Sequence, residues 1–124
     1  MVRASQPAVV VYGMPNCDTV RKARAWLDER GVAVRFHDVR RDGLAPELLD
    51  RWAAALTPEA LLNRKGSTWR ALSEEERAAA GTAAGLLTLI ARQPTLLRRP
   101  VVEWPDGPTI GFDPEEFAER QLGR

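Results

Sequence analysis

Cys17 is the only cysteine of the chain, and it stands between a run of β-forming residues and an amphipathic helical pattern. Residues 9–12 predict a short buried strand, Gly13 and Pro15 predict a turn, and a helix is predicted from Asp18. The first amide groups of a helix lack intrahelical partners, and the helix dipole is positive there. Such a place stabilises a thiolate, which is the nucleophilic form of cysteine. The pattern therefore predicts a reactive thiol at Cys17.

The elements on either side of Cys17 belong to a predicted strand–helix–strand unit. Four residues recur at helical spacing and form the predicted buried face of the helix: Val20, Ala23, Trp26 and Leu27. Gly31 is placed to end this helix, and residues 33–39 alternate as a half-buried strand does. So short a crossover makes the two strands parallel. His37, the only histidine, is interpreted as an ordinary residue of the second strand.

The middle of the chain, about residues 44–97, contains helical patterns and no strand pattern. Helix starts are indicated at Pro46, at Thr57-Pro58, at Ser73 and at Thr82. Residues 40–43 and 68–72 are predicted to be turns.

The C-terminal part predicts two strands and a last helix. The strands cover residues 101–104 and 109–112, and residues 105–108 form the hairpin turn between them. Asp113 caps the helix, from which Phe117 and Leu122 are predicted to face inward. The order βαβ, helices, ββα predicts an α/β protein with a thioredoxin-like fold, a mixed four-stranded sheet and a helical insertion. We expect residues 1–124 to form a single domain.

The bulk composition excludes several classes of protein. With 18 Lys and Arg against 17 Asp and Glu, the net charge of +1 draws the chain neither to nucleic acid nor to a membrane surface. One cysteine and one histidine argue against a zinc site. Apolar runs are too short for a membrane-spanning helix or a signal sequence, so a cytoplasmic location is expected. Residues 1–7 are interpreted as a loose leader.

Several segments, in order along the chain, carry a resemblance to a known family. They are YGMPNCDT (residues 12–19), RKA (21–23), FHD (36–38), LLNRKG (61–66), TWR (68–70) and Arg99-Pro100. Together they resemble the arsenate reductase-like (ArsC/Spx) family, most closely its small YffB-like branch. The resemblance implies a thioredoxin-like sheet with an inserted helical subdomain, in agreement with the order of the predicted elements.

The resemblance also implies a site. Arsenate reductases of this family use one N-terminal cysteine as nucleophile and three arginines to hold the oxyanion, and glutathione and glutaredoxin resolve the adduct. Cys17 matches the nucleophile, and Arg99 matches one of the arginines. The remaining residues predicted to bind substrate or an anion are Asn16, Thr19, Arg64, Lys65 and Pro100, of which Pro100 is expected to be cis. No metal is expected.

At the other two arginine positions the chain has Asn63 and Phe112. A charge-assisted hydrogen bond contributes about 1.5–3 kcal/mol, so each missing arginine is expected to weaken oxyanion binding about ten- to a hundredfold. The Spx branch carries a second cysteine where this chain has Val20. A second thiol must therefore come from another molecule.

The first hypothesis for the function is a thiol-dependent oxidoreductase in which Cys17 forms a mixed disulfide or an oxyanion adduct. Glutathione is the expected co-substrate, and no tightly bound cofactor is expected. One alternative is an arsenate reductase coupled to glutathione and glutaredoxin. A second alternative is a non-catalytic, Spx-like regulator of transcription that binds RNA polymerase.

Overall fold

The computed structural model describes residues 9–122, so the predicted leader of residues 1–7 lies outside the described part. The chain divides into two compact units, which are described separately. Residues 9–38 and 99–122 belong to the first unit, and residues 39–98 form the second. Between residues 9 and 122, no helix has the length and apolar character needed to span a bilayer.

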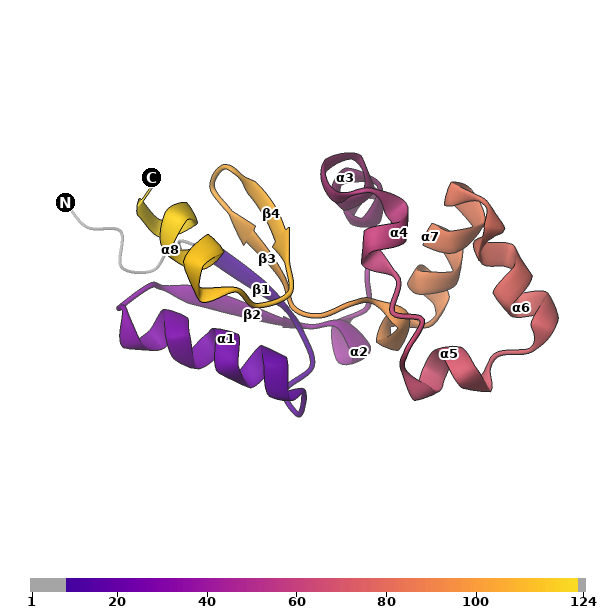
Figure 1. The fold of residues 1–124 in the computed structure, drawn as a ribbon, viewed down its shortest axis with the longest axis horizontal. Coiled ribbons are helices and arrows are strands. Elements are labelled where there is room, and N and C mark those ends of the chain that lie inside the picture. The colour runs from indigo at the N-terminus through magenta and orange to yellow at the C-terminus, as the bar shows by residue number, and fades with distance from the viewer. Residues whose placement is uncertain (1–8, 123–124) are drawn as a thin grey trace. The chain divides into compact units, whose positions relative to one another are not determined.

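The first unit is a mixed four-stranded sheet with two helices (Figure 1). Its elements are β1 (Val9–Gly13), α1 (Asp18–Glu29), β2 (Val34–Asp38), β3 (Val101–Trp104), β4 (Gly107–Ile110) and α8 (Pro114–Leu122). The strand order is β2-β1-β3-β4. β1 pairs with β2 in parallel, as the short crossover predicted, and β3 pairs with β1 and β4 in antiparallel fashion. This arrangement confirms the thioredoxin-like α/β fold.

α1 and α8 pack against the same face of the sheet through an aromatic core. The ring of Phe117 from α8 is fully buried and meets Trp26, Trp104 and Phe112 edge-on, at centroid distances of 5.0–5.5 Å. Such pairs stabilise a core by about 0.5–1.5 kcal/mol each beyond the area they bury. The buried indole of Trp104 donates its Nε1 hydrogen to Thr109 Oγ1 at 3.0 Å. The core therefore ties both helices to β1 and β3.

The second unit consists of helices. They are α2 (Val39–Asp42), α3 (Pro46–Leu56), α4 (Pro58–Leu61), α5 (Ser67–Ala71), α6 (Glu74–Ala78), η1 (Ala79–Gly81), α7 (Ala83–Arg92) and η2 (Pro94–Leu96). The predicted caps are confirmed: Thr57, Ser73 and Thr82 each accept an amide hydrogen from the first turn of their helix. Leu62 and Leu97 form an isolated antiparallel bridge rather than a strand.

Two predicted turns of the second unit are short helices instead. Residues 40–43 belong to a helical turn because the amide of Gly43 bonds the carbonyl of Val39 at 3.0 Å, and Gly43, at φ 75°, ends it. Residues 68–72 lie in and after α5, where the amide of Arg70 bonds the carbonyl of Gly66. Both predictions were wrong because a single helical turn is too short to show apolar periodicity.

The C-terminal hairpin and helix also differ from the predictions. β4 begins at Gly107, which pairs with Trp104, so the loop contains only two residues and the strand lies two positions earlier than predicted. Gly107 adopts φ 131°, which favours glycine. Leu122 is 83 % exposed, not inward-facing. It lies five residues after the buried Phe117, and at 100° per residue this places it well away from the buried face of α8.

Candidate active site

Cys17 is the N-cap residue of α1, as the sequence predicted. The turn before it is closed by a hydrogen bond from its amide to the carbonyl of Met14 at 3.2 Å. Its own carbonyl accepts the first intrahelical bond, from the amide of Arg21 at 2.9 Å. The thiol is free, half-buried, and not used as a cap. The residue therefore stands at the end of α1 where the amide groups of residues 18–20 have no partner in the helix, because they precede that first intrahelical bond.

A close contact between strand and helix fixes this position. A Cβ atom on Gly13 would lie 2.6 Å from Cγ2 of Val20, whose side chain is fully buried. Only glycine allows the end of β1 to approach the first turn of α1 so closely. Gly13 thus sets where α1 begins relative to the sheet.

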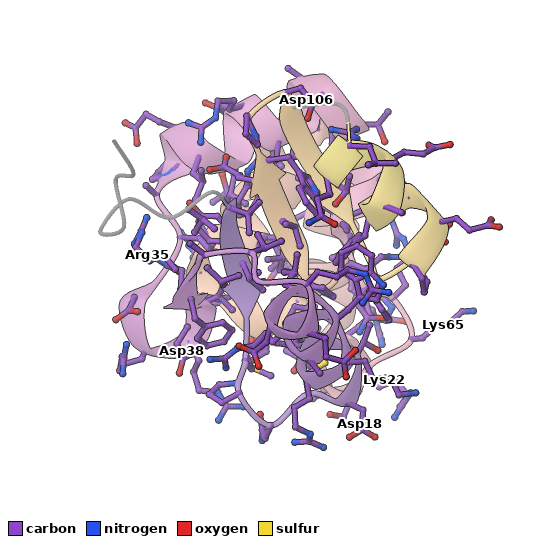
Figure 2. The ribbon with its side chains drawn as sticks, turned by 90° about the vertical axis from the view of Figure 1, so that its left-hand side faces the viewer. Asp18, Lys22, Arg35, Asp38, Lys65 and Asp106 are labelled. Carbon is purple, nitrogen blue, oxygen red and sulfur yellow. The ribbon has the colours of Figure 1, made fainter. Side chains whose placement is uncertain are left out.

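The charges at the start of α1 are mixed. Asp18 forms an exposed ion pair with Arg21, one helical turn later. Figure 2 shows Asp18 and Lys22 pointing outward from this end of the helix. The acid next to the thiol is thus balanced by its own partner, and Lys22 adds a positive charge on the outer surface. Asn16 and Thr19, predicted to bind an anion, are both exposed beside Cys17.

The strand register places Arg99 and Pro100 at the same end of the sheet as Cys17. Tyr12 pairs with Val101, so one step further along the ladder Pro100 lies opposite Gly13. The Arg99–Pro100 bond is cis, as predicted. The Pro100 carbonyl accepts the amide hydrogen of Gly111 at 2.8 Å, which anchors this loop to the end of β4. Arg99 itself is half-buried.

Three further polar side chains lie together on the same sheet: His37, which was interpreted as an ordinary strand residue, and Tyr12 and Glu103, which were not singled out by sequence. The rings of Tyr12 and His37 lie 4.9 Å apart, and Tyr12 OH bonds Glu103 Oε1 at 3.3 Å. The three residues come from three different strands, β1, β2 and β3. The pattern of any one strand does not show which residues of the other strands lie beside it. The side chain of Tyr12 lies on the sheet face opposite α1, because its neighbour Val11 belongs to the core under α1.

Arg64 and Lys65 lie in the second unit. Arg64 binds Glu59 through two nitrogens, at 2.6 and 3.1 Å, and its guanidinium lies 4.7 Å from the centre of the Trp69 ring. The hydrogen bond with Glu59 raises the pKa of Arg64 and lowers the pKa of Glu59. Lys65 is exposed. Arg64 therefore already has an anionic partner within its own unit.

The two positions that lack a family arginine have structural roles. The backbone N–H of Asn63 donates to the carbonyl of Leu96 at 2.8 Å, and the side-chain oxygen of Asn63 accepts the backbone amide hydrogen of Lys65 at 3.0 Å. Phe112 packs its ring 5.0 Å from that of Phe117, against the core of the first unit. Neither side chain supplies a cation.

The arrangement suits nucleophilic chemistry at one sulfur. A thiolate at a helix N-cap is stabilised by the first-turn amides and dipole. The chain contains no second cysteine to resolve an adduct. Among residues 9–122, no cluster of three His, Cys, Asp or Glu side chains could hold a metal ion.

Fold and site define a thioredoxin-like protein with a single thiol at the start of its first helix and an inserted helical unit. The sequence profile of the ArsC family matches residues 12–120, and the chain belongs to that family. This confirms the family that the motifs around Cys17 and Arg99 indicated.

Three relatives illustrate the range of the family. A solved structure of the YFFB protein is 40 % identical, covers 90 % of this chain and 97 % of its own, and has a TM-score of 0.86. A structure of an arsenate reductase (ArsC) related protein from Brucella melitensis is 40 % identical over 90 % of this chain and 92 % of its own, with a TM-score of 0.69. The global transcriptional regulator Spx of Streptococcus pyogenes serotype M6 is 29 % identical over 88 % of this chain and 81 % of its own.

Proposed function

We propose that the protein is a thiol-dependent oxidoreductase in which Cys17 is the nucleophile and glutathione the co-substrate. The observation that carries the proposal is the half-buried free thiol of the residue at the N-cap of α1. The absence of any other cysteine makes an external thiol necessary. Glutathione is the common small thiol of reducing compartments and fits this need.

The proposed cycle has two exchange steps. The Cys17 thiolate attacks the glutathionyl sulfur of a mixed disulfide R–S–S–G, forms Cys17–S–S–G, and expels R–S⁻, which takes a proton from water. A glutathione thiolate then attacks the same glutathionyl sulfur, so that oxidised glutathione leaves and the Cys17 thiolate is restored. In net terms, R–S–S–G and one molecule of glutathione give R–SH and oxidised glutathione, so the thiol of that one glutathione is oxidised and the sulfur of R is reduced. Asn16, Thr19 and Arg99, with Pro100 as its cis neighbour, orient the anionic partner.

Intact-mass measurement after incubation with oxidised glutathione tests the first step. One glutathionyl group is expected on the wild-type chain and none on Cys17→Ser. The rate of adduct formation is expected to fall about tenfold in Arg99→Gln, because a charge-assisted hydrogen bond is lost. Arg98→Gln is the matched control, since Arg98 is the exposed neighbour of Arg99. A wild-type chain that forms no adduct would exclude the proposal.

Arsenate reduction is the less favoured enzymatic alternative. The side chain of Asn63 accepts a backbone hydrogen bond and Phe112 packs in the core, so neither supplies a positive charge to an oxyanion. Arg64 is held by Glu59. A glutathione–glutaredoxin coupled assay is therefore expected to show little oxidation of reduced nicotinamide at millimolar arsenate, and rapid turnover would reverse the order of the two enzymatic proposals.

A regulatory function is favoured by one specific observation, the similarity to Spx over most of the chain. Under this alternative the chain binds RNA polymerase and the thiol is inert. Co-purification of polymerase, together with full cellular activity of Cys17→Ala, would support the regulator over the enzyme. Loss of cellular activity in Cys17→Ala without co-purification of polymerase would support the enzyme.

A further inference from the structure

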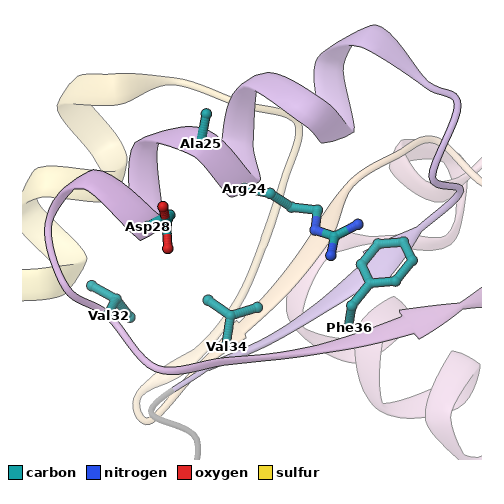
Figure 3. A pocket seen from close by; sticks show the side chains of 6 residues that line it. All are labelled: Arg24, Ala25, Asp28, Val32, Val34 and Phe36. Carbon is teal, nitrogen blue, oxygen red and sulfur yellow. The ribbon is translucent and has the colours of Figure 1, made fainter.

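A groove of about 410 Å³ lies between α1 and the edge strand β2, within the first unit (Figure 3). Six residues line it: Arg24, Ala25, Asp28, Val32, Val34 and Phe36. The three residues from α1 are exposed, and the three from β2 and the loop before it are half-buried. The half-buried residues also pack against the core of the unit, so the floor of the groove is apolar and well supported.

Two opposite charges face this groove without pairing with each other. The guanidinium of Arg24 lies over the ring of Phe36, 4.0 Å from its centre. Asp28 follows one helical turn later and lines the same groove (Figure 3). Among residues 9–122, neither charged group has an ion pair or a side-chain hydrogen bond. An arginine four residues before an acid is the less favourable order for pairing, and the aromatic ring competes for the cation.

We propose that this groove binds a small zwitterion of the α-amino-acid class with an apolar side chain. The carboxylate of the ligand binds Arg24, whose N–H groups at the edge of the stacked guanidinium are suited to a carboxylate. The ammonium binds Asp28, and the apolar side chain rests on Val34. The volume suits a ligand of this size, since it lies toward the lower end of the usual range for small-molecule pockets.

The pair of charges selects against other occupants. A simple anion would bind Arg24 but would be repelled by the carboxylate of Asp28. A simple cation would bind Asp28 but would be repelled by the guanidinium of Arg24. An uncharged apolar ligand would bury parts of both charges without compensation. Only a ligand that carries both charges satisfies both side chains. The site does not involve the sulfur of Cys17, so the proposal is independent of the proposed reductase activity.

Titration of the ¹⁵N-labelled chain with leucine, monitored by ¹H–¹⁵N NMR, tests the proposal. We expect saturable shifts at millimolar leucine, confined to the lining residues and their neighbours in α1 and β2. N-acetylleucine lacks the ammonium and leucinamide lacks the carboxylate, so each is expected to bind at least about tenfold more weakly. No saturable shift at tens of millimolar leucine, or equal binding of the three compounds, would overturn the proposal.

Variants locate the site. Arg24→Met keeps an unbranched chain against Phe36 but loses the charge, and Asp28→Asn keeps the shape of the carboxylate; both are expected to weaken leucine binding about tenfold or more. Arg35→Met and Glu29→Gln are the matched controls, and they should bind as the wild type does. Arg35 is exposed and alternates with the groove residue Val34 along β2, so its side chain lies on the other face of the sheet. Loss of leucine binding in Cys17→Ser would show that leucine binds at the thiol instead and would refute the groove.

Discussion

Gly13 has no room for a side chain, and the substitution Gly13→Ala tests how the thiol is positioned. The new methyl group would lie 2.6 Å from Cγ2 and 3.2 Å from Cγ1 of Val20. Val20 is fully buried, and a β-branched side chain in a helix has essentially one good rotamer, so it cannot turn away. The strain must therefore be relieved by moving the first turn of α1, which carries Cys17 at its N-cap.

The expected destabilisation follows from this overlap. Overpacking of a tight core costs about 1–3 kcal/mol of unfolding free energy. Val20→Ala alone should cost about 1–2 kcal/mol through lost burial and a partly collapsed cavity. In the double variant, which combines Gly13→Ala with Val20→Ala, the added methyl group takes up part of the space that the Val20 side chain vacates. The double variant should therefore be more stable than the sum of the two single changes predicts, by about 1 kcal/mol.

Urea unfolding followed by circular dichroism measures the three free energies, and the rate of alkylation by iodoacetamide reports on Cys17. Gly13→Ala is expected to slow alkylation, because a displaced first turn no longer holds Cys17 and the first amides of α1 in their wild-type arrangement. Gly81→Ala is the matched control: a Cβ there meets no atom within 4 Å, so stability should change by no more than about 1 kcal/mol. Additive free energies for Gly13→Ala and Val20→Ala would refute the reasoning.

Three further changes probe local interactions. Thr109→Val leaves the buried indole N–H of Trp104 without its acceptor and should cost about 1–3 kcal/mol in urea unfolding. Thr82→Ala removes the N-cap bond of α7 and should cost about 1 kcal/mol in the same assay. The pKa of Glu59 is lowered by its hydrogen bond with Arg64, so the stability from this pair is present above the unfolded pKa and is lost as pH falls through the folded one. Glu59→Gln should thus lose less stability than the wild type between pH 6 and pH 3 in low salt.

Each of these changes has a clear opposing result. Thr109→Ser retains the hydroxyl, so a stability equal to that of the wild type would assign the loss in Thr109→Val to the hydrogen bond. An equal loss of stability in Thr109→Ser and Thr109→Val would instead assign the effect to packing. A Thr82→Ser variant that is as unstable as Thr82→Ala would contradict the cap. Identical acid sensitivity of Glu59→Gln and the wild type would show that the exposed ion pair contributes nothing measurable, as many surface pairs do.

Elements of the fold that depend on residues close together in the chain were predictable. The strand–turn–Cys17–helix segment, the caps at Ser73 and Thr82, and the parallel pairing that a short crossover imposes were all read correctly. The family motifs also indicated the cis bond before Pro100. Each of these features reflects a backbone preference or a side-chain bond spanning a few residues, which is why spacing alone reveals it.

Partners that meet across the sheet were not predictable in the same way. Tyr12 and Glu103, which bond each other, stand 91 positions apart, and no local pattern encodes that pairing. The guanidinium of Arg64 binds both carboxylate oxygens of Glu59 and lies over the Trp69 ring. Phe112 packs into the aromatic core. Arg24 and Asp28 form a charged groove only because β2 lies next to α1. Residue type and spacing are enough to place the thiol at a helix start, but which groups surround a side chain depends on how distant segments come together.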